Sequence, residues 1–198
     1  MTADTKRQHD LEKRLSASQL RLRGRHPFFA SLALFAPVHI TDRVDTAATD
    51  GRDIYFNPDF MEELSRNELD GVLLHEVLHA ALLHAVRRGE REPLPWNYAA
   101  DIVVNGMIKE AGLSLPPGAV RKREWEDRSV EEVYELLLKN SVKVPGGLLI
   151  DLRPELAEGR KQDNGNSKNQ QGEGRSLSQG EIEELRAHWR LARQQARV

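Results

Sequence analysis

The sequence predicts an α+β fold that is mostly helical and holds a small antiparallel sheet. A capping-box pattern, Ser65 with Glu68, precedes a strongly apolar run, which indicates one long helix that ends at Gly89. Because this segment is apolar on nearly every side, we expect it to lie in the middle of its domain. Residues 38–41 and 52–56 have strand-like patterns, and antiparallel pairing across the turn-rich link between them is the simplest arrangement.

Further helices are expected before and after this central segment. Residues 3–24 have an amphipathic pattern, and residues 96–111 form a second apolar stretch of helical length. The apolar stretch 27–37 is ambiguous between helix and strand. Two more capping boxes predict helices at about residues 130–139 and 179–195.

The sequence also predicts how the chain divides. Residues 1–155 contain the elements that can share one core, and we expect them to form a globular domain. Residues 156–179 are rich in Gly, Asn, Gln, Ser and Lys and have almost no apolar side chains, so we expect a flexible polar linker there. Residues 180–198 would then form a C-terminal helix.

The composition excludes several classes of function. The 198 residues include 29 Lys and Arg against 31 Asp and Glu, so the net charge of −2 excludes binding of nucleic acid through bulk charge. There is no cysteine, so any metal site must use His, Asp or Glu. No apolar run approaches the roughly 20 residues of a membrane-spanning helix, and the first residues lack the apolar core of a signal peptide. We therefore expect a cytoplasmic protein that does not use a membrane.

The central helix contains the motif H-E-x-x-H, from His75 through Glu76 to His79. Residues four positions apart share a helical face, so both imidazoles can reach one ion. Glu76 lies about 60° round the helix from His79, close enough to hold a water molecule on that ion. Burying these polar groups among Leu, Val and Ala would be costly without a partner such as a metal. The motif predicts a zinc site with Glu76 as general base; the alternative is a polar cluster held by ordinary hydrogen bonds.

Asp101 is the favoured third ligand. A second helix packed antiparallel to the first would bring Asp101 back to nearly the level of the His pair. Asp101 lies in an apolar run, where a carboxylate needs a cation or hydrogen-bond donors, and Asn97 and Asn105 lie one turn to either side of it. The weaker alternatives lie at element ends, where solvent can satisfy a carboxylate: Glu90, Glu110 and Glu126.

His84 is a further histidine of the same segment. It lies nine residues after His75, so on a continuous helix its side chain would point about 180° away from that of His75. We therefore interpret His84 as a capping or core histidine rather than a ligand.

A peptidase also needs a place for the substrate and a group that stabilises the oxyanion. The strand over residues 52–56 could hold an extended peptide along an exposed edge, or it could be an internal strand. The candidates for the oxyanion are Tyr98, Tyr134, His39 and nearby Arg residues, and the sequence does not choose between them.

Four blocks of the sequence resemble those of a known family: TDGRDIYFNPDF, ELDGVLLHEVLHAALLHAVRR, PWNYAADIVVNGMI and SVEEVYELL. They are similar to bacterial metallopeptidases whose longer members carry a von Willebrand factor A-like domain at the C-terminus, over about residues 49–138. The resemblance implies a zincin-like fold in which the small sheet packs on the motif helix. It also implies His75 and His79 as ligands and Glu76 as the base, and it places the Asp of the W-N-x-A-x-D block at Asp101.

The resemblance also suggests a partner, because the long members often occur beside MoxR-type AAA ATPases. This chain departs from the long members, since the linker and one helix after residue 155 leave no room for the A-like domain. The leading hypothesis is a zinc-dependent peptidase acting on a peptide or protein substrate. The alternative is a catalytically silent, metal-stabilised module that docks a AAA ATPase or another protein. A nucleic-acid-associated protease that uses the basic segment from Lys13 to Arg25 is the least favoured hypothesis.

Overall fold

A computed structural model describes residues 3–145, 149–161 and 176–197 of the chain. Most of the linker predicted from the sequence, residues 162–175, lies outside the described residues. The elements are α1 (Ala3–Arg25), α2 (Pro27–Ala33), β1 (Val38–Ile40), β2 (Ala47–Thr49), β3 (Ile54–Phe56), α3 (Pro58–Glu63), α4 (Arg66–Ala81), α5 (His84–Arg87), α6 (Pro93–Glu110), η1 (Arg123–Trp125), α7 (Val130–Lys139), η2 (Pro154–Lys161) and α8 (Gln179–Gln195). The predicted α+β class, mostly helical with a small sheet, is confirmed.

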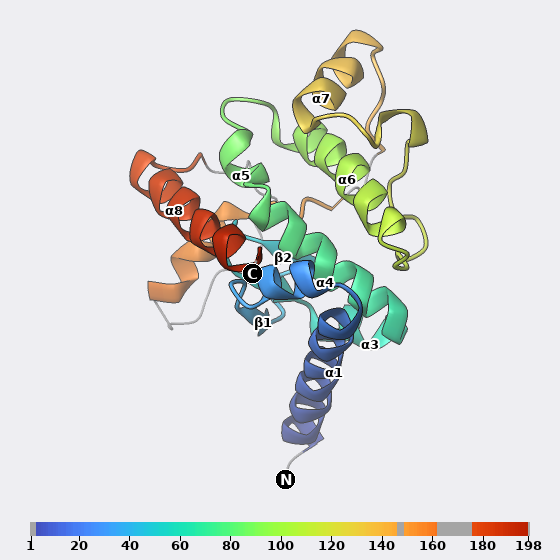
Figure 1. Ribbon diagram of the computed structural model, residues 1–198, viewed down its shortest axis with the longest axis vertical. Helices are drawn as coiled ribbons and strands as arrows, with labels where there is room; N and C mark the ends of the chain where they lie inside the picture. Colours follow the sequence, from blue (N-terminus) through green and yellow to red (C-terminus); the bar gives the residue numbers. More distant parts are fainter. Residues whose placement is uncertain (1–2, 146–148, 162–175, 198) are drawn as a thin grey trace.

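Helix α4 crosses the middle of the molecule (Figure 1). It begins where the capping box predicts, because Ser65 Oγ accepts a hydrogen bond from the Glu68 amide at 3.3 Å and Glu68 Oε2 accepts one from the Ser65 amide at 2.8 Å. All of its residues from Leu69 to Ala81 are buried. The expected central helix is therefore confirmed.

The prediction that this helix continues to Gly89 is wrong. Helix α4 ends at Ala81, and Leu83 adopts the left-handed conformation with φ 58°, so that the short helix α5 starts in a new direction. Groups far away in the sequence satisfy the carbonyls around this break. Arg193 Nη1 donates to Ala81 O at 2.9 Å, and Trp96 Nε1 donates to His84 O at 3.0 Å.

The sheet is mixed rather than antiparallel. Its strand order is β1-β3-β2, in which β1 runs parallel to β3 and β2 runs antiparallel to it. The expected antiparallel pairing of residues 38–41 with 52–56 is wrong because the link between them contains a strand of its own, β2, which occupies the other side of β3. The suggestion that residues 52–56 offer an exposed edge is wrong for the same reason, since β3 is the central strand and all three of its residues are buried.

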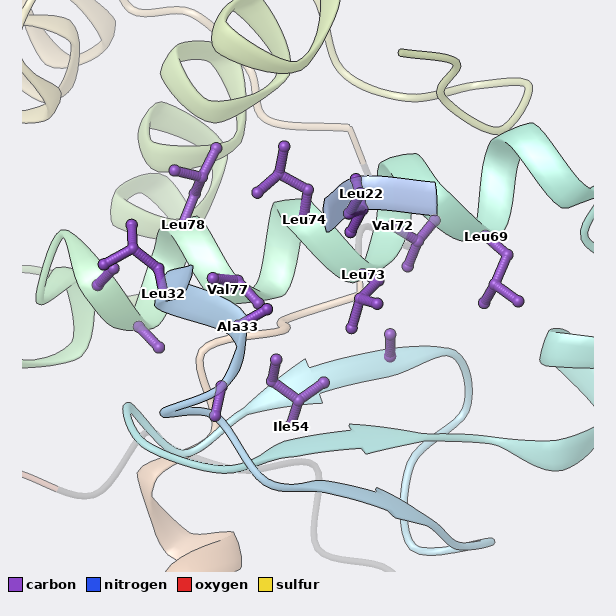
Figure 2. Packing of buried hydrophobic residues seen from close by; sticks show 14 of the residues in the cluster. Leu22, Leu32, Ala33, Ile54, Leu69, Val72, Leu73, Leu74, Val77 and Leu78 are labelled. Carbon is purple, nitrogen blue, oxygen red and sulfur yellow. The ribbon is translucent and has the colours of Figure 1, made fainter. Parts of the chain in front are cut away.

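The main core lies between α4 and the sheet. Ile54 of β3 points toward Leu73 and Val77 of α4, and all three side chains are fully buried (Figure 2). Helices α1 and α2 cover another side of α4. Helix α8 contacts α2 and α4, and the fully buried Trp189 donates from its indole to Gly51 O at 2.7 Å.

A second apolar cluster joins α6 to α7 beside this core. The loop after α6 returns over α4 at Gly71, where a Cβ atom would lie 1.8 Å from Ser114 O. Only glycine allows this approach of two backbones. Among the described residues, no helix combines the length and the apolar character that crossing a bilayer requires.

Candidate metal centre

Four side chains from three parts of the chain meet at one point. His75 and His79 come from α4, Asp101 from α6, and Asp151 from the segment just before η2. One potential ligand atom from each lies within 4.8 Å of the other three. The structure therefore brings together the three ligands predicted from the sequence and adds Asp151, which the sequence reasoning missed.

The distances within this group suit a single metal ion. The two imidazole Nε2 atoms are 2.9 Å apart, and His75 Nε2 lies 3.1 Å from Asp151 Oδ2. Asp101 Oδ1 lies 3.4 Å from His79 Nε2 and 3.9 Å from His75 Nε2. Ligand atoms of a tetrahedral zinc ion, each about 2.0–2.1 Å from the metal, are about 3.3 Å from one another. The donor set of two imidazoles and two carboxylates is also one that zinc accepts.

Buried oxygen atoms without partners mark the same place. Among the residues that the structure describes, Glu76 Oε2, Asp101 Oδ1 and Asp151 Oδ1 are buried and accept no hydrogen bond. An unpaired buried carboxylate is costly, and a divalent cation would compensate for it. The group therefore fits a metal ion better than it fits a purely hydrogen-bonded cluster.

Burial and the charges of neighbouring side chains shift the pKa values of the residues in and beside the candidate metal centre. Burial, together with the neighbouring His75, lowers the pKa of His79 to about 3, so its imidazole is neutral and available as a ligand at neutral pH. Burial raises the pKa of Glu76 and that of Asp101 well above their ordinary values, and the charge of Asp151 adds to both shifts. Without a cation, Glu76 and Asp101 therefore favour their protonated forms, whereas His79 and His75 lower the pKa of Asp151 against the opposing effect of burial.

Two asparagine side chains hydrogen-bond to potential ligands and fix their orientation. Asn105 Nδ2 donates to Val120 O at 2.9 Å, so Asn105 Oδ1 is free to accept a hydrogen bond from His75 Nδ1 at 2.9 Å. This tautomer leaves Nε2 of His75 without a proton and available to a metal. Asn97 Nδ2 donates to Asp101 Oδ2 at 3.3 Å. Asn97 thus supports Asp101 as expected, whereas Asn105 supports His75 instead.

His84 is buried and lies against His79 instead of pointing away. Its Nδ1 atom is 3.1 Å from Nδ1 of His79, because the left-handed Leu83 turns α5 back toward the site. His79 Nδ1 donates to His84 Nδ1 in the arrangement that leaves His79 Nε2 free for a metal. His84 lies outside the group of four potential ligands, in agreement with its interpretation as a core histidine, although the reasoning from a continuous helix was wrong.

The other sequence candidates lie outside this group. Glu90 and Glu110 are exposed, and Glu126 binds Arg121 through both carboxylate oxygens. Of the oxyanion candidates, Tyr98 is half-buried on α6, Tyr134 accepts from the Glu92 amide at 3.3 Å, and His39 pairs with Asp53 at 2.8 Å. The structure therefore does not select an oxyanion-stabilising residue from these candidates.

Asp151 was missed because its position depends on pairing between distant segments. The Thr49 amide donates to Asp151 O at 2.8 Å, and the Arg153 amide donates to Thr49 O at 2.8 Å. The only local signal was a single acidic residue among the apolar residues of the stretch 149–152. Such a signal does not identify a ligand until the pairing with β2 is known.

A family model described as "Putative metallopeptidase domain" matches residues 10–194. The chain belongs to this family. The matched part of this metallopeptidase-family chain contains all four residues of the candidate centre and extends beyond the region of resemblance seen in the sequence. No curated protein and no solved structure matches the chain.

Proposed function

We propose that the protein is a zinc-dependent metallopeptidase in which Glu76 is the general base. The observation that supports this most directly is the meeting of His75, His79 and Asp101 beside Glu76, in a chain of a metallopeptidase family. The two imidazoles and Asp101 hold the metal. A zinc ion bound there supplies Lewis acidity, which polarises a carbonyl group and lowers the pKa of a nearby water molecule to about 7.

The chain's own residues perform the proton transfers. Glu76 follows directly after His75 on α4, and its Oε2 atom has no partner among the described residues. Glu76 takes a proton from the attacking water molecule and passes it to the amine nitrogen of the broken peptide bond. Asn105 and His84 keep the Nδ1 protons of the two ligand imidazoles in place. The substrate is a peptide or protein, and the compartment we propose is the cytoplasm.

Elemental analysis of Glu76→Gln together with a hydrolysis assay on fluorescent casein tests this function. We expect the variant to keep one zinc ion per chain and to hydrolyse casein at least about 100-fold more slowly, since general-base catalysis contributes about that much or more. Glu63→Gln, an exposed change of the same chemistry on α3, is the control and should match the wild type. A zinc-loaded wild type that cleaves neither casein nor a mixed peptide library would contradict the proposal.

The presence of four potential metal ligands from the protein favours one alternative function. Four protein ligands are typical of a structural zinc site, whereas catalytic sites keep one position open. The alternative function is therefore a catalytically silent, metal-stabilised module that docks a MoxR-type AAA ATPase or another protein. Zinc binding without hydrolysis under any condition would favour this alternative.

A further inference from the structure

The segment that contains Asp151 covers the outer edge of β2. Thr49 forms an isolated parallel bridge with Leu152, through the hydrogen bonds from the Thr49 amide to Asp151 O and from the Arg153 amide to Thr49 O. Since the other side of β2 pairs with β3, residues 151–153 occupy the position of a fourth strand at this edge. An extended peptide added to a sheet edge would make hydrogen bonds of the same kind.

The same residues are held on the side that faces α6. The Leu152 amide donates to Asn97 Oδ1 at 3.2 Å, and the Leu152 side chain is buried in the cluster formed by α6 and α7. Asn97 also donates to Asp101. Residues 151–153 therefore lie between the sheet edge and the second helix of the candidate metal centre.

One short stretch of chain thus fills two places that a peptidase needs. Asp151 supplies the fourth donor atom, and a catalytic zinc site keeps this position for water or substrate. The backbone around Asp151 takes the hydrogen bonds of Thr49 that an extended substrate would use. A peptide that replaced residues 151–153 would pass directly beside His75.

Asp151 is also the donor that is easiest to displace. Its side chain is 14% exposed, against 11% for His75, 8% for Asp101 and 0% for His79, and these three lie on the long helices α4 and α6. Asp151 itself accepts one backbone hydrogen bond from Thr49, and its segment is further held by the Arg153 amide on Thr49 O and the Leu152 amide on Asn97 Oδ1. Exchange of Asp151 therefore moves one extended segment, whereas exchange of any of the other three donors would move α4 or α6.

We propose that the β2 edge at Thr49 is the binding site for an extended peptide substrate, and that residues 151–153 occupy it as a competing strand, with Asp151 as a displaceable fourth ligand. This inference rests on the proposed metallopeptidase function. The structure then represents a closed form of the protein. The form opens when the backbone of a peptide substrate replaces residues 151–153 at the sheet edge and its carbonyl group replaces the Asp151 carboxylate.

The first test measures access to the metal rather than activity. The protein is loaded with Co²⁺, and the binding of acetohydroxamate is followed through the visible spectrum of the cobalt site. We expect Asp151→Asn to keep the metal and to bind acetohydroxamate at least about 10-fold more tightly than the wild type, because an amide is a poor substitute for a carboxylate ligand. Asp127→Asn, at an exposed aspartate, should behave as the wild type.

Two results of this test would overturn the inference, and two others would contradict the proposed function instead. Equal affinity of wild type and Asp151→Asn would show that Asp151 does not close the site. Loss of metal from Asp151→Asn would show that Asp151 is an obligatory ligand rather than a displaceable one. A wild-type protein that binds no metal would contradict the proposed metallopeptidase function itself. An Asp151→Asn variant that binds acetohydroxamate but hydrolyses no substrate would contradict the hydrolytic function, while the role of Asp151 in closing the site would stand.

The second test uses the wild-type zinc protein and therefore does not depend on the folding of a variant. Hydrogen exchange is measured with and without a saturating tetra-alanine hydroxamate. We expect the Arg153 amide to exchange at least about 10-fold faster with the peptide bound, while the Thr49 amide stays protected by its new partner. An Arg153 amide that stays protected would overturn the competition. A tetra-alanine hydroxamate that binds the wild-type zinc protein no more tightly than acetohydroxamate does would overturn the assignment of the edge.

Discussion

Asp101 is a carboxylate that the rest of the protein does not satisfy. One of its oxygens accepts from Asn97, and the other, Oδ1, is buried without a hydrogen-bond partner among the described residues. It lies on α6, whereas the two imidazoles lie on α4, so a metal held by all three connects two helices. Removal of Asp101 would therefore leave the two imidazoles of α4 with Asp151 alone and would break the connection to α6.

We predict that Asp101→Ala sharply reduces the zinc content of the purified protein, with an affinity loss of at least about 100-fold, since changing residues that only orient a ligand already costs 10–100-fold. Elemental mass spectrometry of protein purified without added metal is the measurement. Asp127→Ala, at an exposed position, should leave one zinc per chain. Full zinc retention in Asp101→Ala would mean that the His pair and Asp151 suffice.

The pH dependence of metal binding follows from the same groups. Burial and the charge of Asp151 raise the pKa of Asp101, and Asp151 and Asp101 raise the pKa of His75 against the opposing effect of burial. Both groups therefore keep protons to higher pH in the metal-free protein, and these protons must leave when the metal binds. His79, with its pKa lowered to about 3, has no proton to release at neutral pH.

We therefore expect zinc affinity to fall as the pH is lowered through the raised pKa values of Asp101 and His75. Calorimetric titrations in two buffers with different ionisation enthalpies should show proton release that is larger at pH 6 than at pH 8. Identical heats in both buffers at pH 6 would contradict this expectation.

Among the secondary-structure elements, those with local signals were predictable and those fixed by distant contacts were not. The capping boxes predict the starts of α4, α7 and α8, because their two hydrogen bonds join residues only three positions apart. The break at Leu83 has no glycine or proline to mark it, and Arg193 stabilises it from the far end of the chain. Strand β2 was hidden in a turn-rich sequence because its pairing with β3, rather than its own pattern, defines it.

The candidate site divides in the same way. His75 and His79 were predictable from helical periodicity, and Asp101 from an antiparallel return of the next helix. Asp151 depends on a bridge to Thr49, which no local pattern contains. Sequence reasoning therefore found the donors carried by helices and missed the donor carried by an extended segment.

The approach of the loop after α6 to α4 gives a prediction about stability. A Cβ at Gly71 would lie 1.8 Å from Ser114 O, so Gly71→Ala must push two backbones apart. We expect the free energy of unfolding to fall by about 1–3 kcal/mol or more, as in other overpacked sites. Gly24→Ala is the matched control, because a Cβ there meets nothing within 4 Å and alanine favours the helix α1. Denaturant unfolding of both variants measures the difference, and equal effects would contradict the steric argument.

For the molecule as a whole, the metal centre lies between two helices that contribute mainly to different apolar clusters, although Val104 and Ile108 of α6 also belong to the main core. Helix α4 belongs to the main core with the sheet, whereas α6 contributes strongly to the second cluster with α7. A metal shared by both helices therefore links the stability of the two clusters.

Chelation should lower the melting temperature of the whole protein in one transition. With free zinc at about 100 times its dissociation constant, binding stabilises the folded state by about 2.7 kcal/mol. For a chain of this size that corresponds to about 5–10 °C. Scanning calorimetry with and without EDTA measures the shift, and restoring zinc should reverse it. An unchanged melting temperature would indicate a polar cluster that is satisfied without metal.

The bridge between Thr49 and Leu152 also affects the order in which parts of the site form during synthesis. During synthesis, β2, α4 and α6 leave the ribosome well before Asp151, so a nascent chain of intermediate length has both imidazoles and Asp101 but an uncovered sheet edge. Trp189 reaches Gly51, two residues from Thr49, only after a further stretch has been made. Segments near Leu152 and Trp189 therefore complete a region whose other half, around Thr49 and Gly51, is translated much earlier.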